Sequence, residues 1–488
     1  MELNKKQYTC IIIGTGFSGV AMGIKLKELG IHDFVLLEKA DDIGGTWREN
    51  TYPGAECDIP SALYSYSFEP YPDWEYKWSM QGQILSYIQY VAHKHDLRPH
   101  IHFEKEMTSA SWQSVEKVWS LQTKDGSEYS TRFLVTAIGQ LHHPSTPAFD
   151  GVEKFSGESF HSAQWNHDIS LEGKTVGVIG NAASAVQFIP EIAKIAGTVK
   201  IFQRSANWML PKQDRIYKDW EKNLVKKLPF LLKLYRFRIW LLGGGLFFLM
   251  QNKNNWLRKI YQKKSISFIN EHIKDPKTVQ LLTPLFPMGA KRVLFSDTYY
   301  PALARPNVSI ISDSIKRITE EGVEVSDKEH HLLDVLIFAT GFKSNPFLLG
   351  LDVKGASGIT IREAWKDGHV NYKGISVSGF PNFFMMYGPN TNLGHNSIIL
   401  MIEAQAKYIA KSVHHMIKHD LSSIDVKKES MLSYYNRIQE RLKEMIWANI
   451  DDSWYISVRG DLPNNYPGRT MEYIQETRQV DLSAYVLS

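Results

Sequence analysis

Three glycines and one acidic residue near the N-terminus have the types and the spacing of a nucleotide-binding turn. Gly14, Gly16 and Gly19 follow an apolar stretch at 8–13, and the next apolar stretch, FVLLE, ends at Glu38. Glycines let the backbone approach a pyrophosphate at a helix N-terminus, and a carboxylate after the next strand can accept hydrogen bonds from ribose hydroxyls. The order of strand, glycine turn, helix, strand and acid therefore predicts a dinucleotide site.

The same order recurs at 174–204 with a different residue at its end. Gly180 closes the apolar stretch KTVGVIG, Ala182 replaces the middle glycine of the turn, and the next apolar stretch leads to Arg204. Glu38 and Arg204 each follow the first glycine of their turn by 24 residues, so they occupy equivalent places. A guanidinium there suits a ribose that carries a 2′-phosphate, which indicates NADPH. The sequence thus predicts two nucleotides of different chemistry on two units.

Two further apolar stretches indicate how these units are connected. Residues 131–140 and 334–342 each end in small residues and would carry the chain out of one unit and into the other. We therefore expect an α/β fold with two Rossmann-like domains, the second inserted in the first. The predicted division is 1–145 for the first part of the first domain, 146–330 for the inserted domain with a helical insertion at 212–285, and 331–488 for the second part of the first domain and the C-terminal segment.

The composition excludes several other classes of protein. The net charge of +4 over 488 residues demands no nucleic-acid partner. Cys10 and Cys57 are not closely spaced, which excludes a disulfide framework and a dithiol redox centre and suits a cytoplasmic protein. No cluster of His, Cys, Asp or Glu has the spacing of metal ligands, so no metal is expected. The N-terminal residues enter a strand pattern directly, and no secretory signal is expected.

An apolar stretch at 228–250 allows two interpretations. Its uncharged part is shorter than the roughly 20 residues that a membrane-spanning helix needs. The three glycines at 243–245 are expected to break any helix there. The favoured interpretation is a buried helical hairpin. The alternative is a basic, apolar surface that associates weakly with a membrane or admits hydrophobic substrates.

Two longer motifs carry a resemblance to a known family. Residues 44–58, GGTWRENTYPGAECD, match the pattern [A/G]GxWxxxx[F/Y]P[G/M]xxxD at every defined position. Residues 155–166, FSGESFHSAQWN, match FxGxxxHxxxW through His161 and Trp165, whereas Asn166 stands where Pro or Asp is usual. With both nucleotide motifs, the chain resembles the type I Baeyer–Villiger monooxygenases, class B flavoproteins of the flavin-containing monooxygenase superfamily that use FAD, NADPH and dioxygen. The resemblance extends through YGPNTNLGH and NNYPGRTMEY, and so over essentially the whole chain.

This resemblance implies roles for particular residues. Arg292, in PMGAKRVLFSDTYY, would be the catalytic arginine over the flavin, and Asp58 would face it. Because 155–166 lies just after the crossing from the first domain to the second, His161 and Trp165 are expected to act as a hinge rather than as a catalytic base. The implied FAD contacts are Gly14, Gly16, Ser18, Gly19, Glu38, Thr46, Trp47, Arg48, Glu49, Asp58, Tyr64, Met107 and Gln140. The implied NADPH contacts are Gly180, Asn181, Ala182, Ala183, Ser184, Ala185, Gln187 and Arg292, with Arg204, Ser205 and Lys291 at the 2′-phosphate.

The reaction implied by the resemblance is insertion of one oxygen atom of dioxygen next to a ketone carbonyl. NADPH would reduce FAD, and a flavin peroxide would convert a hydrophobic ketone into an ester or lactone, or oxidise a sulfide. Arg292 would keep the peroxide anionic, because a guanidinium stays charged in a dry site. Two alternatives stay open: a flavin monooxygenase that oxygenates nitrogen or sulfur centres, and an uncoupled NADPH oxidase or redox-responsive flavoprotein. The sequence makes no prediction of the particular ketone or of the oligomeric state.

Overall fold

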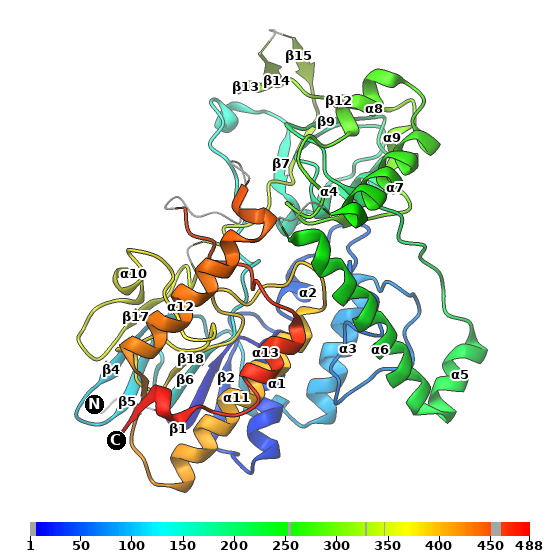
Figure 1. Cartoon of the computed structure of the whole chain (residues 1–488). Helices are drawn as coiled ribbons and strands as arrows, with labels where there is room; N and C mark the ends of the chain where they lie inside the picture. Colours follow the sequence, from blue (N-terminus) through cyan, green and yellow to red (C-terminus); the bar gives the residue numbers. More distant parts are fainter. Residues whose placement is uncertain (1–5, 252–254, 327–328, 346, 450–459) are drawn as a thin grey trace.

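Two α/β units of unequal size make up the protein, described here by a computed structural model (Figure 1). The structure describes residues 6–251, 255–326, 329–345, 347–449 and 460–488. Residues 1–5, which belong to the stretch where no secretory signal was expected, lie outside the described residues. The larger unit occupies the lower part of the view and contains both ends of the chain, while the smaller unit lies above it.

The larger unit is built on a mixed sheet with the order β17-β4-β5-β6-β1-β2-β3, and β18 also pairs with β6. The central strands β6, β1, β2 and β18 run parallel, whereas β4, β5 and β6 form an antiparallel meander. The strands are β1 (Lys6–Ile13), β2 (Phe34–Leu37), β3 (Ile101–His102), β4 (Met107–Gln113), β5 (Val118–Thr123), β6 (Glu128–Thr136), β17 (Asp352–Lys354) and β18 (Phe383–Met385), with a separate pair β19 (Ile424–Val426) and β20 (Tyr485–Leu487). The helices are α1 (Phe17–Glu28), α2 (Thr46–Glu49), α3 (Gln81–Lys94), α10 (Ile361–Ala364), α11 (Ile398–Lys418), α12 (Lys428–Lys443) and α13 (Thr470–Glu476).

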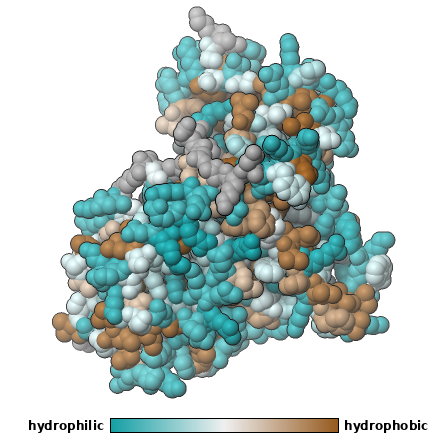
Figure 2. Space-filling view, in the orientation of Figure 1, coloured by the Kyte–Doolittle hydropathy of each residue, from teal (hydrophilic) through white to brown (hydrophobic). Residues whose placement is uncertain are grey.

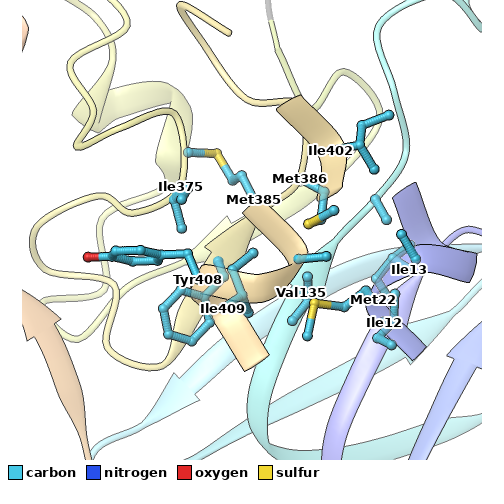
Figure 3. Packing of buried hydrophobic residues seen from close by; sticks show 14 of the residues in the cluster. Ile12, Ile13, Met22, Val135, Ile375, Met385, Met386, Ile402, Tyr408 and Ile409 are labelled. Atoms are coloured by element: carbon cyan, nitrogen blue, oxygen red, sulfur yellow. The ribbon is translucent and has the colours of Figure 1, made fainter. Parts of the chain in front are cut away.

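The core of this unit lies between the parallel strands and helices α1 and α11, which pack on each other. Strand β1 reads CIII at its inner end, and these four residues are buried because both faces of a parallel sheet are covered. Figure 3 shows Ile12 and Val135 of neighbouring strands facing Met22 of α1 and Ile409 of α11. The rigid sheet thus fixes the glycine turn that connects β1 to α1.

The smaller unit is a parallel sheet with the order β12-β9-β8-β16-β7. Its strands are β7 (Glu158–His161), β8 (Thr175–Ile179), β9 (Thr198–Phe202), β12 (Val308–Ile311) and β16 (Val335–Phe338), with an added antiparallel sheet of β13 (Ile315–Thr319), β14 (Gly322–Val325) and β15 (His330–Leu332). Its helices are α4 (Ala183–Ile192), α7 (Trp256–His272), α8 (Pro276–Leu282) and α9 (Tyr299–Leu303), and β10 (Met209–Leu210) pairs with β11 (Leu294–Phe295). Strand β16 pairs with both β7 and β8. The second unit therefore continues to Phe338, beyond the boundary expected at 330, because this strand completes its sheet.

Residues 212–285, predicted to form a helical insertion, contain α5 (Asp219–Lys227), α6 (Pro229–Leu246), α7 and α8. The prediction of a buried hairpin at 228–250 is wrong, because this stretch is one long helix followed by the 3-10 turn η4 (Phe247–Met250). Helix α6 also continues through the glycines at 243–245, which were expected to break it. Within the described residues, no helix is both long enough and apolar enough to cross a membrane.

Candidate active site

The first glycine turn has the close packing that a phosphate cradle requires. Gly14 has a left-handed backbone with φ of 101°, and a Cβ on Gly19 would lie 1.9 Å from the carbonyl oxygen of Gly14. Gly16 precedes helix α1 at the N-cap position and has no side chain to cap it, so the backbone N–H groups of the first helical turn face the mouth of the glycine turn. This arrangement fits a pyrophosphate at the helix N-terminus, as the sequence predicts. Ser18 lies buried in the same helical turn.

Glu38 follows β2 and is held in place by the turn itself. Its Oε2 accepts hydrogen bonds from the backbone N–H of Thr15 at 2.9 Å and from the Thr15 hydroxyl at 2.7 Å. Its Oε1 accepts a hydrogen bond from the backbone N–H of Ala40 at 3.0 Å. The carboxylate is therefore fixed, and Oε1, which accepts only the Ala40 bond, has a second lone pair that could accept a ribose hydroxyl. Sequence reasoning missed Thr15, although its place between two glycines of the turn is a usable signal.

The 44–58 segment covers this turn. A Cβ on Gly45 would lie 2.9 Å from the Cα of Gly16, so the two backbones are in contact. Helix α2 carries Thr46, Arg48 and Glu49, with the Arg48 guanidinium paired to Asp41 and Glu49. In the same helix, the indole N–H of Trp47 donates to the Tyr64 hydroxyl at 3.1 Å, and the two rings stand edge to face. These expected FAD residues gather around one edge of the sheet.

Two further expected FAD residues lie in or beside the same sheet. Met107 begins β4 and is buried in the core of the larger unit. Gln140 follows β6, and its side-chain amide donates to the carbonyl oxygen of Tyr387 at 3.1 Å. This contact fixes the turn after β6 to the segment after β18, and β6 lies beside β1, where the first nucleotide site is expected.

Arg292 and Asp58 form a bidentate ion pair although they are 234 residues apart. The Arg292 Nε donates to Asp58 Oδ2 at 2.7 Å, and Nη2 donates to Oδ1 at 2.6 Å. Asp58 comes from the segment that covers the first turn, whereas Arg292 comes from the smaller unit, just before β11. The predicted pairing is confirmed. It places a guanidinium, which stays charged in any environment, where the two units meet.

The second glycine turn resembles the first in geometry. Gly180 has φ of 104°, and a Cβ there would lie 2.5 Å from the carbonyl oxygen of Ala339. Helix α4 follows Ala182, which stands at the N-cap position and makes no side-chain cap. Its first residues, Ala183, Ser184 and Ala185, are small, so the N-terminus of α4 offers backbone N–H groups to a second pyrophosphate.

Two of the three groups expected at the 2′-phosphate directly follow β9, and the third, Lys291, precedes β11. Arg204 and Ser205 are exposed just after this strand, and the Asn181 amide donates to the Ser205 carbonyl at 2.9 Å. Lys291 lies three residues before β11, with its ammonium 5.0 Å from the centre of the Phe286 ring. Arg204 is thus held at the mouth of the second turn, as its spacing predicts.

Gln187 has different partners from those expected. Its side chain lies against the 44–58 segment, where Oε1 accepts from the Tyr52 hydroxyl at 2.8 Å and Nε2 donates to the Glu56 carbonyl at 3.0 Å. Burial raises the pKa of Tyr52 to about 12, although a hydrogen bond with Ser184 acts in the opposite direction. The carboxamide of Gln187 therefore joins the two units instead of facing a pyrophosphate.

The segment 155–166 belongs to the smaller unit, where β7 joins the sheet and Trp165 packs on α4. Trp165 packs against Phe160 and against Phe188 of α4, with ring centres 5.2 Å apart in each case. Phe188 in turn meets Tyr52 at 6.1 Å. His161 ends β7, is buried, and accepts a hydrogen bond from the Ala163 N–H through Nδ1 at 3.1 Å. Burial lowers the pKa of His161, so the ring stays neutral and serves as a structural acceptor.

Sequence reasoning missed a buried ion pair between Lys212 and Glu56, whose Nζ and Oε2 are 2.5 Å apart. Burial raises the pKa of Glu56, whereas Lys212 acts to lower it. Nothing in the local sequence of either residue marks them as partners, because the contact depends on how the insertion folds back on the 44–58 segment.

Both cysteines are buried and free, Cys10 in β1 and Cys57 beside Asp58. Burial raises the pKa of the Cys57 thiol well above its ordinary value, with a further contribution from Asp58. Since the thiolate is the reactive form, Cys57 is inert at neutral pH. The arrangement offers charge stabilisation and nucleotide binding but no thiol chemistry at Cys57.

Comparisons with known proteins agree with this arrangement over nearly the whole chain. A profile for pyridine nucleotide-disulphide oxidoreductases matches residues 11–229. The chain is 37% identical over 486 residues to a Baeyer-Villiger monooxygenase of Pseudomonas aeruginosa, covering 98% of this chain and 91% of that protein. It is 37% identical over 501 residues to the FAD-binding monooxygenase ktnD of Aspergillus niger, covering 98% and 81%. A structure of oxidized steroid monooxygenase bound to NADP is similar with a TM-score of 0.87 at 27% identity, over 99% of both chains.

Proposed function

The chain belongs to the Baeyer–Villiger monooxygenase family and is an FAD- and NADPH-dependent monooxygenase, and we propose that it converts hydrophobic ketones into esters or lactones. The observation that carries this proposal is the bidentate pair of Arg292 and Asp58, which joins the two nucleotide units. When bound, reduced FAD supplies the activation of dioxygen, and NADPH supplies the electrons.

The chain's own contribution to the reaction is a fixed positive charge. As oxygen is transferred, negative charge develops on the carbonyl oxygen of the ketone, and a guanidinium held beside it stabilises that charge without moving. Asp58 fixes the guanidinium plane through two hydrogen bonds and offsets the cost of placing a cation in a partly buried site. Asp58 is thus a positioning residue for Arg292.

The same chain would hold its two nucleotides by different means. The first turn and Glu38 would bind FAD, and Trp47 of the covering segment and its partner Tyr64 would complete that site. The second turn binds the NADPH pyrophosphate, and Arg204 recognises the 2′-phosphate. Gln187 and Trp165 transmit the position of the NADPH unit to the segment that covers FAD.

Product analysis of the wild type and of Arg292→Ala tests this proposal. The yellow enzyme is given NADPH and a mixed panel of ketones and sulfides, and esters, sulfoxides and hydrogen peroxide are measured. We expect ester from the wild type, and we expect Arg292→Ala to consume NADPH and reduce its flavin without forming ester. Ester formation by Arg292→Ala would exclude the role of this arginine. Formation of sulfoxide without any ester would favour a monooxygenase that oxygenates nitrogen or sulfur centres. Hydrogen peroxide formed in an amount equal to the NADPH consumed would favour an uncoupled NADPH oxidase.

A further inference from the structure

Helices α5 and α6 carry an apolar face that the rest of the protein does not cover. On α6, Phe230, Leu234, Phe237 and Leu241 follow one another at spacings of four, three and four residues, so they lie on one face. Their exposed fractions are 61%, 60%, 55% and 58%. The exposed face of a surface helix is ordinarily polar. Figure 2 shows hydrophobic residues over this part of the molecule, along α6 and next to the outlying helix α5.

Helix α5 continues the apolar face. Trp220 and Leu224 are 61% and 39% exposed at a spacing of one helical turn, and Leu228 at the junction with α6 is 41% exposed. The two helices pack on each other, so their apolar residues belong to one surface, which we call the α5–α6 face. It is defined by Trp220, Leu224, Leu228, Phe230, Leu234, Phe237, Leu241 and Leu242.

The surroundings of this face are strongly basic. Apart from the buried Arg236, residues 218–242 contain six lysines and arginines against two acidic residues. Lys233 and Arg238 are exposed on α6 within the apolar stripe, and Lys222 and Lys227 lie on α5. A helix with exposed aromatic and aliphatic residues and a basic border matches the chemistry of an anionic lipid surface, because headgroups pair with the cations while the apolar side chains enter the acyl boundary.

Helix α6, which carries most of this face, is fixed to the larger unit on its other side. Arg236, on the opposite side of α6, is buried and donates from Nη1 to the Ser65 hydroxyl at 2.5 Å and from Nη2 to the Ser65 carbonyl at 3.1 Å. Near the other end of the helix, a Cβ on Gly243 would lie 2.9 Å from the carbonyl oxygen of His395. The Asn396 amide donates to the Trp240 carbonyl at 3.1 Å. The exposed stripe is therefore presented by a helix whose other side is fixed against the larger unit.

We propose that the α5–α6 face docks the enzyme peripherally on an anionic lipid bilayer. The bilayer is not spanned, since within the described residues no helix is suited to that. Docking depends on the α5–α6 face alone and does not require that the proposed oxygenation takes place. It would place an enzyme for hydrophobic substrates at the phase in which such substrates accumulate.

Vesicle flotation with the FAD-loaded full-length enzyme tests this inference in the absence of substrate. We expect the wild type to float with phosphatidylcholine vesicles that contain phosphatidylglycerol, more weakly with phosphatidylcholine alone, and less at high salt. Lys233→Glu with Arg238→Glu is expected to lower partitioning into the anionic vesicles by at least about 25-fold, since each cation contributes about fivefold. Phe230→Ser with Phe237→Ser is expected to lower it by about a hundredfold.

A matched control is Ile195→Ser with Ile359→Ser, which removes two apolar residues that are also exposed, at 53% and 43%, outside α5 and α6. This control should float like the wild type. All variants should retain FAD and should oxidise a short, water-soluble ketone at the wild-type rate, so that loss of docking is distinguished from misfolding and from failure of the proposed reaction. The inference is overturned if the wild type does not float, if the charge and phenylalanine variants float equally well, or if the face instead mediates a dimer that the phenylalanine variant dissociates.

Discussion

Removal of the Asp58 carboxylate should separate its positioning role from the charge of Arg292. Asp58→Ala eliminates two charge-assisted hydrogen bonds of 2.7 and 2.6 Å. Such bonds contribute about 1.5–3 kcal/mol each when buried, but the Arg292 and Asp58 side chains are 40% and 22% exposed, so we take about 2 kcal/mol for the pair. If that energy is lost from the transition state, ester formation falls by about 30-fold.

The assay compares ester formed with NADPH consumed, with hydrogen peroxide measured in parallel. Arg292→Lys retains the charge but cannot form the two-pronged contact. In the Arg292→Lys variant, Asp58→Ala should therefore lower ester formation by a much smaller factor than in the wild type. The matched control is Glu324→Ala, which breaks the ion pair of Glu324 with Arg317 in the outlying sheet β13–β15 and should leave the yield of ester unchanged.

The positioning role of Asp58 is refuted if Asp58→Ala lowers ester formation by the same factor in the wild type and in Arg292→Lys, since its effect would then not pass through Arg292. It is also refuted if the wild-type ratio of ester to NADPH is retained. A fall in FAD content that accounts for the whole loss of ester would assign Asp58 to flavin binding alone.

Three other substitutions test separate parts of the site. Gly19→Ala would place a methyl group 1.9 Å from the Gly14 carbonyl oxygen, and the purified protein should contain much less FAD by absorbance. Lys212→Met removes the charge that lowers the pKa of Glu56, so burial raises the folded pKa further above the unfolded value. The variant therefore keeps its stability in acid and loses it as the pH rises through the folded pKa of Glu56. We expect the free energy of unfolding to fall by about 3 kcal/mol at neutral pH and by less in mildly acidic buffer. Adding Glu56→Gln should restore most of the lost stability. Trp165→Ala should raise the KM for NADPH several-fold and increase hydrogen peroxide formation at unchanged FAD content, whereas equal values to wild type would exclude a coupling role.

The parts of the site that could be predicted are those fixed by local geometry. The turn at Gly14 and the acid at Glu38 belong to one strand–helix–strand unit, so their relation is set by element lengths. The Arg292–Asp58 pair was predicted through the family resemblance and not through spacing, because the two residues are 234 apart. The boundary near 330 was misplaced, because a strand alone does not indicate which of two sheets it joins.

Helix α6 shows how tertiary contacts overrule local propensity. Each glycine in a helix interior costs about 1 kcal/mol relative to alanine, which is why a break was expected at 243–245. In the fold, a side chain at Gly243 would collide with the His395 carbonyl, so close packing of α6 on the larger unit requires glycine there. The burial of α6 was also wrongly predicted, since apolar residues on one helix face cannot reveal from sequence whether anything covers that face.

Helix α4 provides a physical connection between the two expected nucleotide sites. Its N-terminus forms part of the second glycine turn, so a bound pyrophosphate would attract and orient it. One turn further, Gln187 bonds to Tyr52 and Phe188 contacts both Tyr52 and Trp165. Tyr52 lies in the segment that ends at Asp58, which holds Arg292. If α4 moves on nucleotide binding, its contacts with Tyr52 carry the displacement to the covering segment, and Trp165 moves with α4 because both belong to the smaller unit.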